Sequence, residues 1–188
     1  MAGEKKRGKI VVISGPSGSG KTTICERLKP DPRLRVAVSA TTRPPRGAEE
    51  DGVDYRFFTT NEFERLIAEG KLLEHARVLG NYYGTLREPM DNAVDAGFCY
   101  ILNIDVHGGA AVRKLLPDST FIFIVPPSEE ELRGRLEKRG TDSPTDIRRR
   151  LELARKEMGY RKSYDHVVVN DTVDNAVAEI KKIIFGEK

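Results

Sequence analysis

A glycine-rich octapeptide between an apolar run and a helical pattern constrains this chain more than any other feature. The stretch Gly15-Pro-Ser-Gly-Ser-Gly-Lys-Thr22 has the spacing G-x-x-x-x-G-K-[ST] and follows the apolar run 9–14. A helical pattern continues from Lys21 to Lys29 and stops at Pro30. Small residues let consecutive backbone N–H groups curl around phosphate oxygens, and the following helix directs its positive end at them. This order therefore predicts a nucleoside triphosphate site.

The loop by itself fits an ATPase, a GTPase switch or a kinase, and the rest of the sequence narrows the choice. We expect Lys21 to reach the β- and γ-phosphates and the Thr22 hydroxyl to ligate Mg²⁺. A GTPase is expected to carry an NKxD-type base reader, and the chain contains no Asn–Lys pair. A mechanical ATPase of this size usually needs partner domains. The prediction that remains is a kinase for a small anionic acceptor.

Apolar runs alternate with helical patterns along most of the chain. The runs at 9–14, 36–39, 100–105, 121–125 and 166–170 predict strands. Helix starts follow Ser128 and Ser143, because each opens a capping pattern, and helical spacing closes the chain from Val173 to Ile184. This alternation predicts an α/β fold, in which a parallel sheet carries helices on both faces.

The stretch at about 41–96 breaks this alternation. It opens with Thr41-Thr-Arg-Pro-Pro-Arg-Gly47 and contains a short helix that Asn61 is expected to cap. Residues 55–58, 72–74 and 82–85 predict short strands, the last two antiparallel. We interpret this stretch as a small α/β insertion in a single domain whose core comprises residues 8–40 and 97–188.

Length and composition exclude several other classes of protein. A chain of 188 residues fits one domain, and its net charge of +3 is too small to favour nucleic acid as a partner. The longest apolar runs have five residues, so we expect no membrane span, and the charged N-terminus lacks the apolar segment of a secretory signal. Cys25 and Cys99 lie outside any metal-binding pattern. We therefore expect a cytoplasmic protein.

Motifs spread over nearly the whole chain resemble those of the guanylate kinase family. Besides the glycine-rich loop they include Val38-Ser-Ala-Thr-Thr-Arg-Pro-Pro-Arg46, Gly52-Val-Asp-Tyr55, Gly80-Asn-Tyr-Tyr-Gly-Thr85, Ile101-Leu-Asn-Ile-Asp105 and Arg139-Gly-Thr-Asp142. The resemblance implies a P-loop NTPase fold with a GMP-binding insertion at about 41–96 and a helical lid at about 135–150. It also implies Mg²⁺-dependent transfer of the γ-phosphoryl group of ATP to GMP. The acceptor phosphate is already ionised, so no general base is required.

The resemblance assigns roles to individual residues of the acceptor site. Two Arg forks and two phenols suit a dianionic phosphate, and the four residues concerned are Arg43, Arg46, Tyr55 and Tyr83. The guanine readers are Ser39, Glu74 and Thr85. Asp105, at the end of an apolar run, belongs to the active site and faces either the metal-bound water or the guanine. Asn103 stands where the family is commonly acidic.

Further assignments concern ATP and the transferred group. The residues that the resemblance assigns to ATP are Gly15, Pro16, Ser17, Gly18, Ser19, Gly20, Lys21, Thr22, Thr23, Arg135, Arg139 and Asn170. Asn170 fits equally well as a cap of the last helix. The residues expected to act in catalysis are Lys21, Arg43, Arg139, Arg150 and Asp105.

Two other functions remain open at this point. One is a non-catalytic guanylate-kinase-like module that binds phosphorylated partners, against which the intact Lys21 and Thr22 argue. The other is a P-loop kinase for a different small phosphorylated acceptor, against which Ser39 and Glu74 argue. The oligomeric state is undetermined.

Overall fold

Two sheets organise the computed structural model, which describes residues 7–78, 80–138 and 143–186. The core sheet has the order β2 (Leu34–Val36), β7 (Cys99–Asn103), β1 (Ile10–Ser14), β8 (Thr120–Val125) and β9 (His166–Val169). All neighbouring strands in it are parallel, and the register places Val12 opposite Leu102 on one side and Phe121 on the other. The expected α/β fold with a parallel sheet is confirmed.

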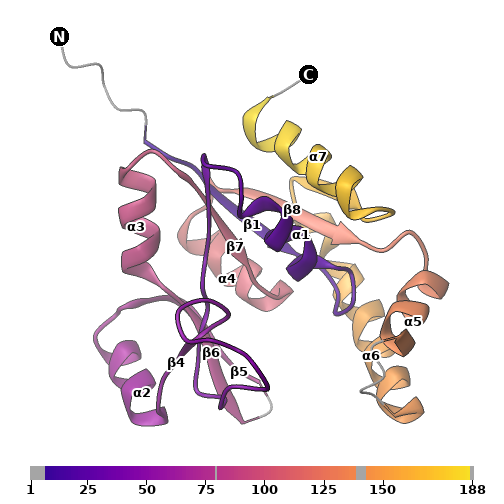
Figure 1. The fold of residues 1–188 in the computed structure, drawn as a ribbon, viewed down its shortest axis with the longest axis horizontal. Coiled ribbons are helices and arrows are strands. Elements are labelled where there is room, and N and C mark those ends of the chain that lie inside the picture. The colour runs from indigo at the N-terminus through magenta and orange to yellow at the C-terminus, as the bar shows by residue number, and fades with distance from the viewer. Residues whose placement is uncertain (1–6, 79, 139–142, 187–188) are drawn as a thin grey trace.

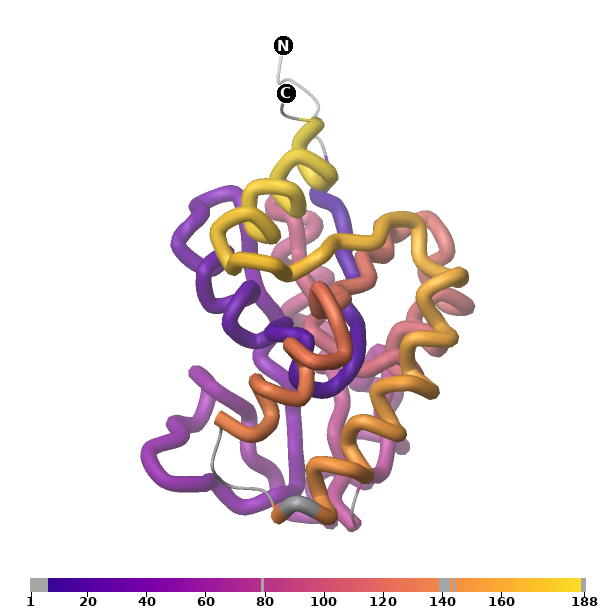
Figure 2. The backbone as a smooth tube through the Cα atoms, turned by 90° about the vertical axis from the view of Figure 1, so that its right-hand side faces the viewer, coloured from indigo at the N-terminus to yellow at the C-terminus, as the bar shows by residue number. Residues whose placement is uncertain are grey.

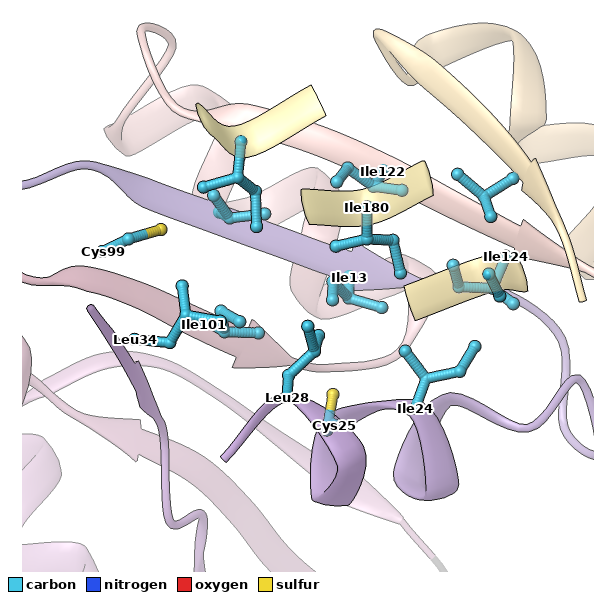
Figure 3. Packing of buried hydrophobic residues seen from close by; sticks show 14 residues of the cluster. Ile13, Ile24, Cys25, Leu28, Leu34, Cys99, Ile101, Ile122, Ile124 and Ile180 are labelled. Atoms are coloured by element: carbon cyan, nitrogen blue, oxygen red, sulfur yellow. The ribbon is translucent and has the colours of Figure 1, made fainter. Parts of the chain in front are cut away.

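Helices cover both faces of the core sheet, because the central strands are apolar on both sides. On one face, α1 (Lys21–Leu28) and α7 (Val173–Phe185) pack Ile24, Leu28 and Ile180 against Ile13 and its neighbours (Figure 3). On the other face lie α3 (Arg87–Asp95) and α4 (Val106–Leu115), which pack against Val12. Neither α3 nor α4 was expected from the sequence.

The second sheet is small and mixed, with the order β4 (Arg56–Phe57), β3 (Ala40–Thr41), β6 (Asn81–Leu86) and β5 (Leu72–Val78). It lies with α2 (Thr60–Ala68) at one end of the core sheet (Figure 1), and Phe63 of α2 is fully buried against it. The expected antiparallel pairing of β5 with β6 is confirmed, and both strands are longer than predicted.

Helices α5 (Glu129–Lys138) and α6 (Pro144–Met158) pack against each other through Leu132, Leu136, Leu151 and Ala154. The predicted starts are confirmed, since Ser128 accepts from the Glu131 N–H and Ser143 forms a capping box. Helix α6 extends along one side of the molecule (Figure 2) and leads into the short 3₁₀ helix η1 (Gly159–Ser163).

Three local predictions are wrong, one because a distant strand sets the bounds of β2 and two because a helix cap lies at another residue than expected. The second core strand is Leu34–Val36 rather than 36–39, since the chain leaves the core sheet after Val36 to reach the second sheet. The cap of α2 is Thr59, not Asn61. The strand expected at 100–105 ends at Asn103, and Asp105 instead caps α4.

Candidate active site

The glycine-rich loop 15–20 connects β1 to α1, and two of its glycines have no substitute. Gly15 has a φ of 149°, and a Cβ there would lie 2.2 Å from the backbone oxygen of Ile124. Gly20 has a φ of 92°, and a Cβ there would lie 2.2 Å from Nδ2 of Asn170. Only glycine fits both the backbone angle and the close contact at these two positions. The backbone of the loop therefore stays accessible to an anion at the start of α1.

Lys21 and Thr22 begin α1 directly behind this loop. The Nζ atom of Lys21 donates to the backbone oxygens of Gly15 at 2.6 Å and Pro16 at 3.1 Å. The lysine side chain therefore lies across the mouth of the loop, where it adds positive charge to the helix N-terminus. The side chains of Thr22 and Thr23 are exposed in the first turn.

A magnesium ion would have one protein ligand here, the Thr22 hydroxyl. No cluster of three or more His, Cys, Asp or Glu side chains among the described residues could hold a metal by itself. Mg²⁺ keeps several waters and commonly takes one or two protein oxygens together with substrate phosphates. A single exposed hydroxyl beside a phosphate-binding loop fits that ligand set.

Two side chains from distant elements form hydrogen bonds with the loop. Oε2 of Glu157 on α6 accepts from the Ser17 N–H at 3.1 Å, and burial raises the pKa of this carboxyl. The Asn170 side chain donates to the backbone oxygen of Ser19 at 2.7 Å, while the backbone oxygen of Asn170 accepts from Arg135 at 2.8 Å. The cap of α7 is Thr172, not Asn170. Of the two roles expected for Asn170, the helix cap is therefore wrong, and its side chain contacts the glycine-rich loop instead.

A cavity of about 230 Å³ opens between the second sheet and the carboxyl end of β7. Its lining residues are Ser39, Tyr55, Glu74, Ala76, Val78, Tyr83, Gly84, Asn103, Ile104 and Asp105. Phenol, hydroxyl, amide and carboxylate groups thus converge on a space suited to a small polar molecule. A larger groove of about 890 Å³, lined by residues of β4, α2, β6 and α3, contains none of the predicted site residues.

Glu74 is the half-buried carboxylate of this cavity. The Thr85 hydroxyl, itself buried, donates to Oε1 of Glu74 at 2.8 Å. Burial raises the pKa of Glu74 above its ordinary value, the Thr85 hydrogen bond opposes that shift, and the charge of Asp105 adds to it. Thr85 therefore fixes one oxygen of Glu74, and Glu74 lines the cavity.

Arg43 is buried beside the two tyrosines of the cavity. Its guanidinium carbon lies 5.3 Å from the centre of the Tyr55 ring, and the Tyr55 and Tyr83 ring centres are 6.3 Å apart. The hydrogen bond that Arg43 donates to Glu49 is the largest of the effects that raise the pKa of Arg43, and the Tyr83 side chain adds to it. Arg46 differs, because its side chain is exposed and Glu49 contacts its backbone N–H and backbone oxygen.

The loop and the cavity adjoin at the carboxyl ends of the parallel strands. Ser14, the last residue of β1, donates from Oγ to the backbone oxygen of Asp105 at 3.3 Å. Ser14 immediately precedes the glycine-rich loop, and Asp105 lines the cavity. Ligands of parallel sheets bind in this position, outside the carboxyl ends of the strands. A triphosphate on the loop and a second ligand in the cavity would therefore face each other.

A cation of α5 lies beside the glycine-rich loop, and three consecutive arginines lie on α6. Arg135 is half-buried against Asn170, and Arg150 on α6 is half-buried, whereas Arg148 and Arg149 are exposed. Arg139 lies outside the described residues.

Comparisons with known proteins agree with this geometry. A sequence model of the family described as guanylate kinase matches residues 7–187. The chain belongs to the guanylate kinase family. The guanylate kinase of Clostridium perfringens (strain SM101 / Type A) is 47% identical over 186 residues, which are 98% of this chain and 86% of that protein. The one of Caldanaerobacter subterraneus subsp. tengcongensis is 46% identical over 185 residues, 98% of this chain and 90% of that protein.

A solved structure of a guanylate kinase has the same fold. The crystal structure of the enzyme from Anaplasma phagocytophilum superposes with a TM-score of 0.78 at 34% identity, and the match covers 97% of this chain and 87% of that one. The resemblance inferred from the motifs is therefore confirmed over nearly the full length.

The structure of this guanylate kinase brings together most of the residues predicted for the acceptor site. Ser39, Tyr55, Glu74, Tyr83 and Asp105 line one cavity, with Thr85 and Arg43 directly behind its wall. Arg46 does not line it. Sequence reasoning missed the carboxylates of Glu49 and Glu157, since nothing in the local pattern identifies their partners. Tyr82, next to Tyr83 in the sequence, does not line the cavity and is stacked on Phe63 with ring centres 5.2 Å apart.

Proposed function

We propose that this guanylate kinase transfers the γ-phosphoryl group of ATP to GMP, giving ADP and GDP. The observation that carries the proposal is the hydrogen bond between Ser14 and Asp105, which joins the phosphate-binding loop to a cavity lined by the half-buried carboxylate of Glu74. Guanine presents N1–H and an exocyclic amino group side by side, and the Glu74 carboxylate is suited to accept from both. The nucleotide phosphate would then lie toward Arg43, Tyr55 and Tyr83.

Catalysis in this site rests on position and charge. Transfer brings two highly anionic groups together, and the charge that develops is stabilised by preorganised cations. We assign this role to Lys21 at the glycine-rich loop, to Arg43 beside the cavity and to Arg150 of α6. The acceptor oxygen is ionised at neutral pH, so the chain needs no general base. Its three His residues lie in no catalytic motif.

Mg²⁺ is part of the proposal, with Thr22 as the residue that would hold it. When bound, Mg²⁺ neutralises charge on the β- and γ-phosphates of the donor. We also propose that α5, α6 and the residues between them act as a lid at about 135–150, which excludes water from the reaction. Arg135, Arg139 and Arg150 belong to that lid, and Arg135, Arg139 and Asn170 to the ATP side.

A coupled assay of ADP release over GMP, AMP, UMP and dTMP tests the proposal. We expect rapid ADP release with GMP and little with the others, and no release when Mg²⁺ is chelated. Comparable rates with another monophosphate would instead support a P-loop kinase for a different acceptor. GMP binding without any ADP release would support the non-catalytic module.

A further inference from the structure

The carboxylate of Glu49 holds the Arg43 guanidinium with both of its oxygens. Oε2 lies 2.9 Å from Nη1 and Oε1 lies 3.0 Å from Nη2. The Arg43 side chain is 7% exposed and the Glu49 side chain 25%, so water screens this ion pair far less than a surface pair. A fork-to-fork pair of this kind fixes the orientation of the guanidinium as well as its place.

The pair leaves one edge of the guanidinium without a charged partner, beside the neutral phenols of Tyr55 and Tyr83. An arginine has five N–H donors arranged on two bidentate edges, Nη1 with Nη2 and Nε with Nη2. Glu49 takes the first edge, and the backbone oxygen of Pro44 accepts from Nη1 at 2.7 Å. Within the described part of the chain, no carboxylate or backbone oxygen accepts from Nε. The second edge is therefore available to an anion.

Glu49 also closes the loop that carries both arginines. Its Oε2 accepts from the Arg46 N–H at 2.7 Å, while the Glu49 N–H donates to the backbone oxygen of Arg46 at 3.1 Å. One carboxylate therefore fixes the Arg43 side chain and the backbone at Arg46. The guanidinium held in this way lies beside Tyr55, whose ring lines the cavity.

We propose that Glu49 is a positioning residue for the phosphate of the acceptor: it holds Arg43 by one edge and leaves the other edge for the phosphate. The inference rests on the proposed function, because it takes GMP as the ligand of the cavity. The competing account makes Glu49 an internal substitute for phosphate, which GMP would have to displace. The two accounts predict opposite changes in GMP affinity when Glu49 is substituted. Removal of a positioning group weakens GMP binding, and removal of a competitor strengthens it.

Calorimetric titration of the full chain with GMP and with guanosine, in the absence of ATP, tests the proposal. Glu49→Gln keeps the size of the side chain and removes its charge, and we expect the Kd for GMP to rise about 10- to 100-fold. Guanosine has no phosphate, so its Kd should not change. Glu49→Asp keeps the charge on a shorter side chain, and should restore part of the affinity. The matched control is Glu50→Gln, an exposed neighbour, which should bind GMP like the wild type.

A double-mutant cycle shows whether Glu49 acts through Arg43. In an Arg43→Ala background, Glu49→Gln should change the GMP Kd by less than about 2-fold, because the group that it positions is gone. Tighter GMP binding by Glu49→Gln, an equal loss for guanosine, or an undiminished effect in the Arg43→Ala background would each overturn the proposal. Turnover is measured separately: a wild type that binds GMP and releases no ADP contradicts the proposed function and leaves the binding comparison intact.

Discussion

Glu74 can accept from guanine only while its carboxyl is ionised, and its environment makes ionisation harder. Burial, aided by the charge of Asp105, raises its pKa, so the folded protein binds this proton more tightly than the unfolded chain does. The stability that Glu74 contributes is therefore present at low pH and is lost as the pH rises through the folded pKa. Guanine binding requires the ionised carboxyl of Glu74 and therefore weakens as the pH falls.

This opposition gives a pH prediction for the acceptor. We expect the KM for GMP to rise on acidification, starting at a higher pH than an exposed Glu would give and approaching about tenfold per unit below the pKa of Glu74. The phosphate of GMP also titrates, near about pH 6. Because the phosphate titrates with either protein, the difference between the wild type and Glu74→Gln isolates the carboxyl. If the KM for GMP rises equally on acidification in the two proteins, protonation of Glu74 does not cause the rise.

Lys21 is the other residue whose removal has a defined outcome. Lys21→Ala takes away a cation placed where charge develops on the transferred group, so kcat at saturating ATP should fall by at least roughly 100-fold. Circular dichroism should show an intact fold, since the lysine is not part of the core. Lys29→Ala, at the other end of α1, is the control and should retain activity. A Lys21→Ala protein with wild-type turnover contradicts the role given to this residue.

At the scale of elements, α6 distinguishes two adjacent arginines. Consecutive residues of a helix point about 100° apart, and here Arg150 is half-buried while Arg149 is exposed. We expect Arg150→Ala to lower kcat more than it weakens GMP binding, because lid contacts form mainly on closure. Arg149→Ala should be nearly silent. Steady-state kinetics together with a GMP titration measure both, and equal effects of the two changes would contradict the assigned helix face.

Asp105 has two roles: it caps the start of α4 and it lines the cavity. Its Oδ1 accepts from the Gly108 N–H at 2.7 Å and caps the helix. Asn caps about as well as Asp, so Asp105→Asn should unfold in urea close to the wild type, whereas Asp105→Ala should lose about 1 kcal/mol. Equal losses of unfolding free energy in the two variants would mean that the charge, rather than the cap, stabilises α4.

For the molecule as a whole, local patterns predicted the parts whose structure is decided locally. The glycine-rich loop, the apolar central strands and the capping box at Ser143 are each encoded within a few residues, and the structure confirms them. Helices α3 and α4 escaped prediction because their local signals are poor. Pro89 lies inside α3, and Gly108 and Gly109 lie in the first turn of α4, yet packing on the core sheet stabilises both helices.

The residues of the site divide in the same way, into those that local motifs predict and those that depend on tertiary contacts. Motifs indicated Arg43, Glu74 and Thr85, but the carboxylates that hold the site depend on tertiary contacts. Glu157 lies 140 residues from its partner Ser17, and no local pattern marks that pairing. Glu49 is near Arg43 in sequence, but only the folded loop shows that its two oxygens take a single edge of the guanidinium.

The central claim is that guanine is read by Glu74 in a cavity that faces the phosphate-binding loop, and base preference tests it most directly. The measurement is kcat/KM for GMP and for AMP in the wild type and in Glu74→Gln. Loss of a charge-assisted hydrogen bond in a closed site costs roughly 1.5–3 kcal/mol. We therefore predict that Glu74→Gln lowers kcat/KM for GMP by about 10- to 150-fold, leaves the KM for ATP unchanged and reduces discrimination against AMP. An unchanged GMP-to-AMP preference in Glu74→Gln would contradict the account.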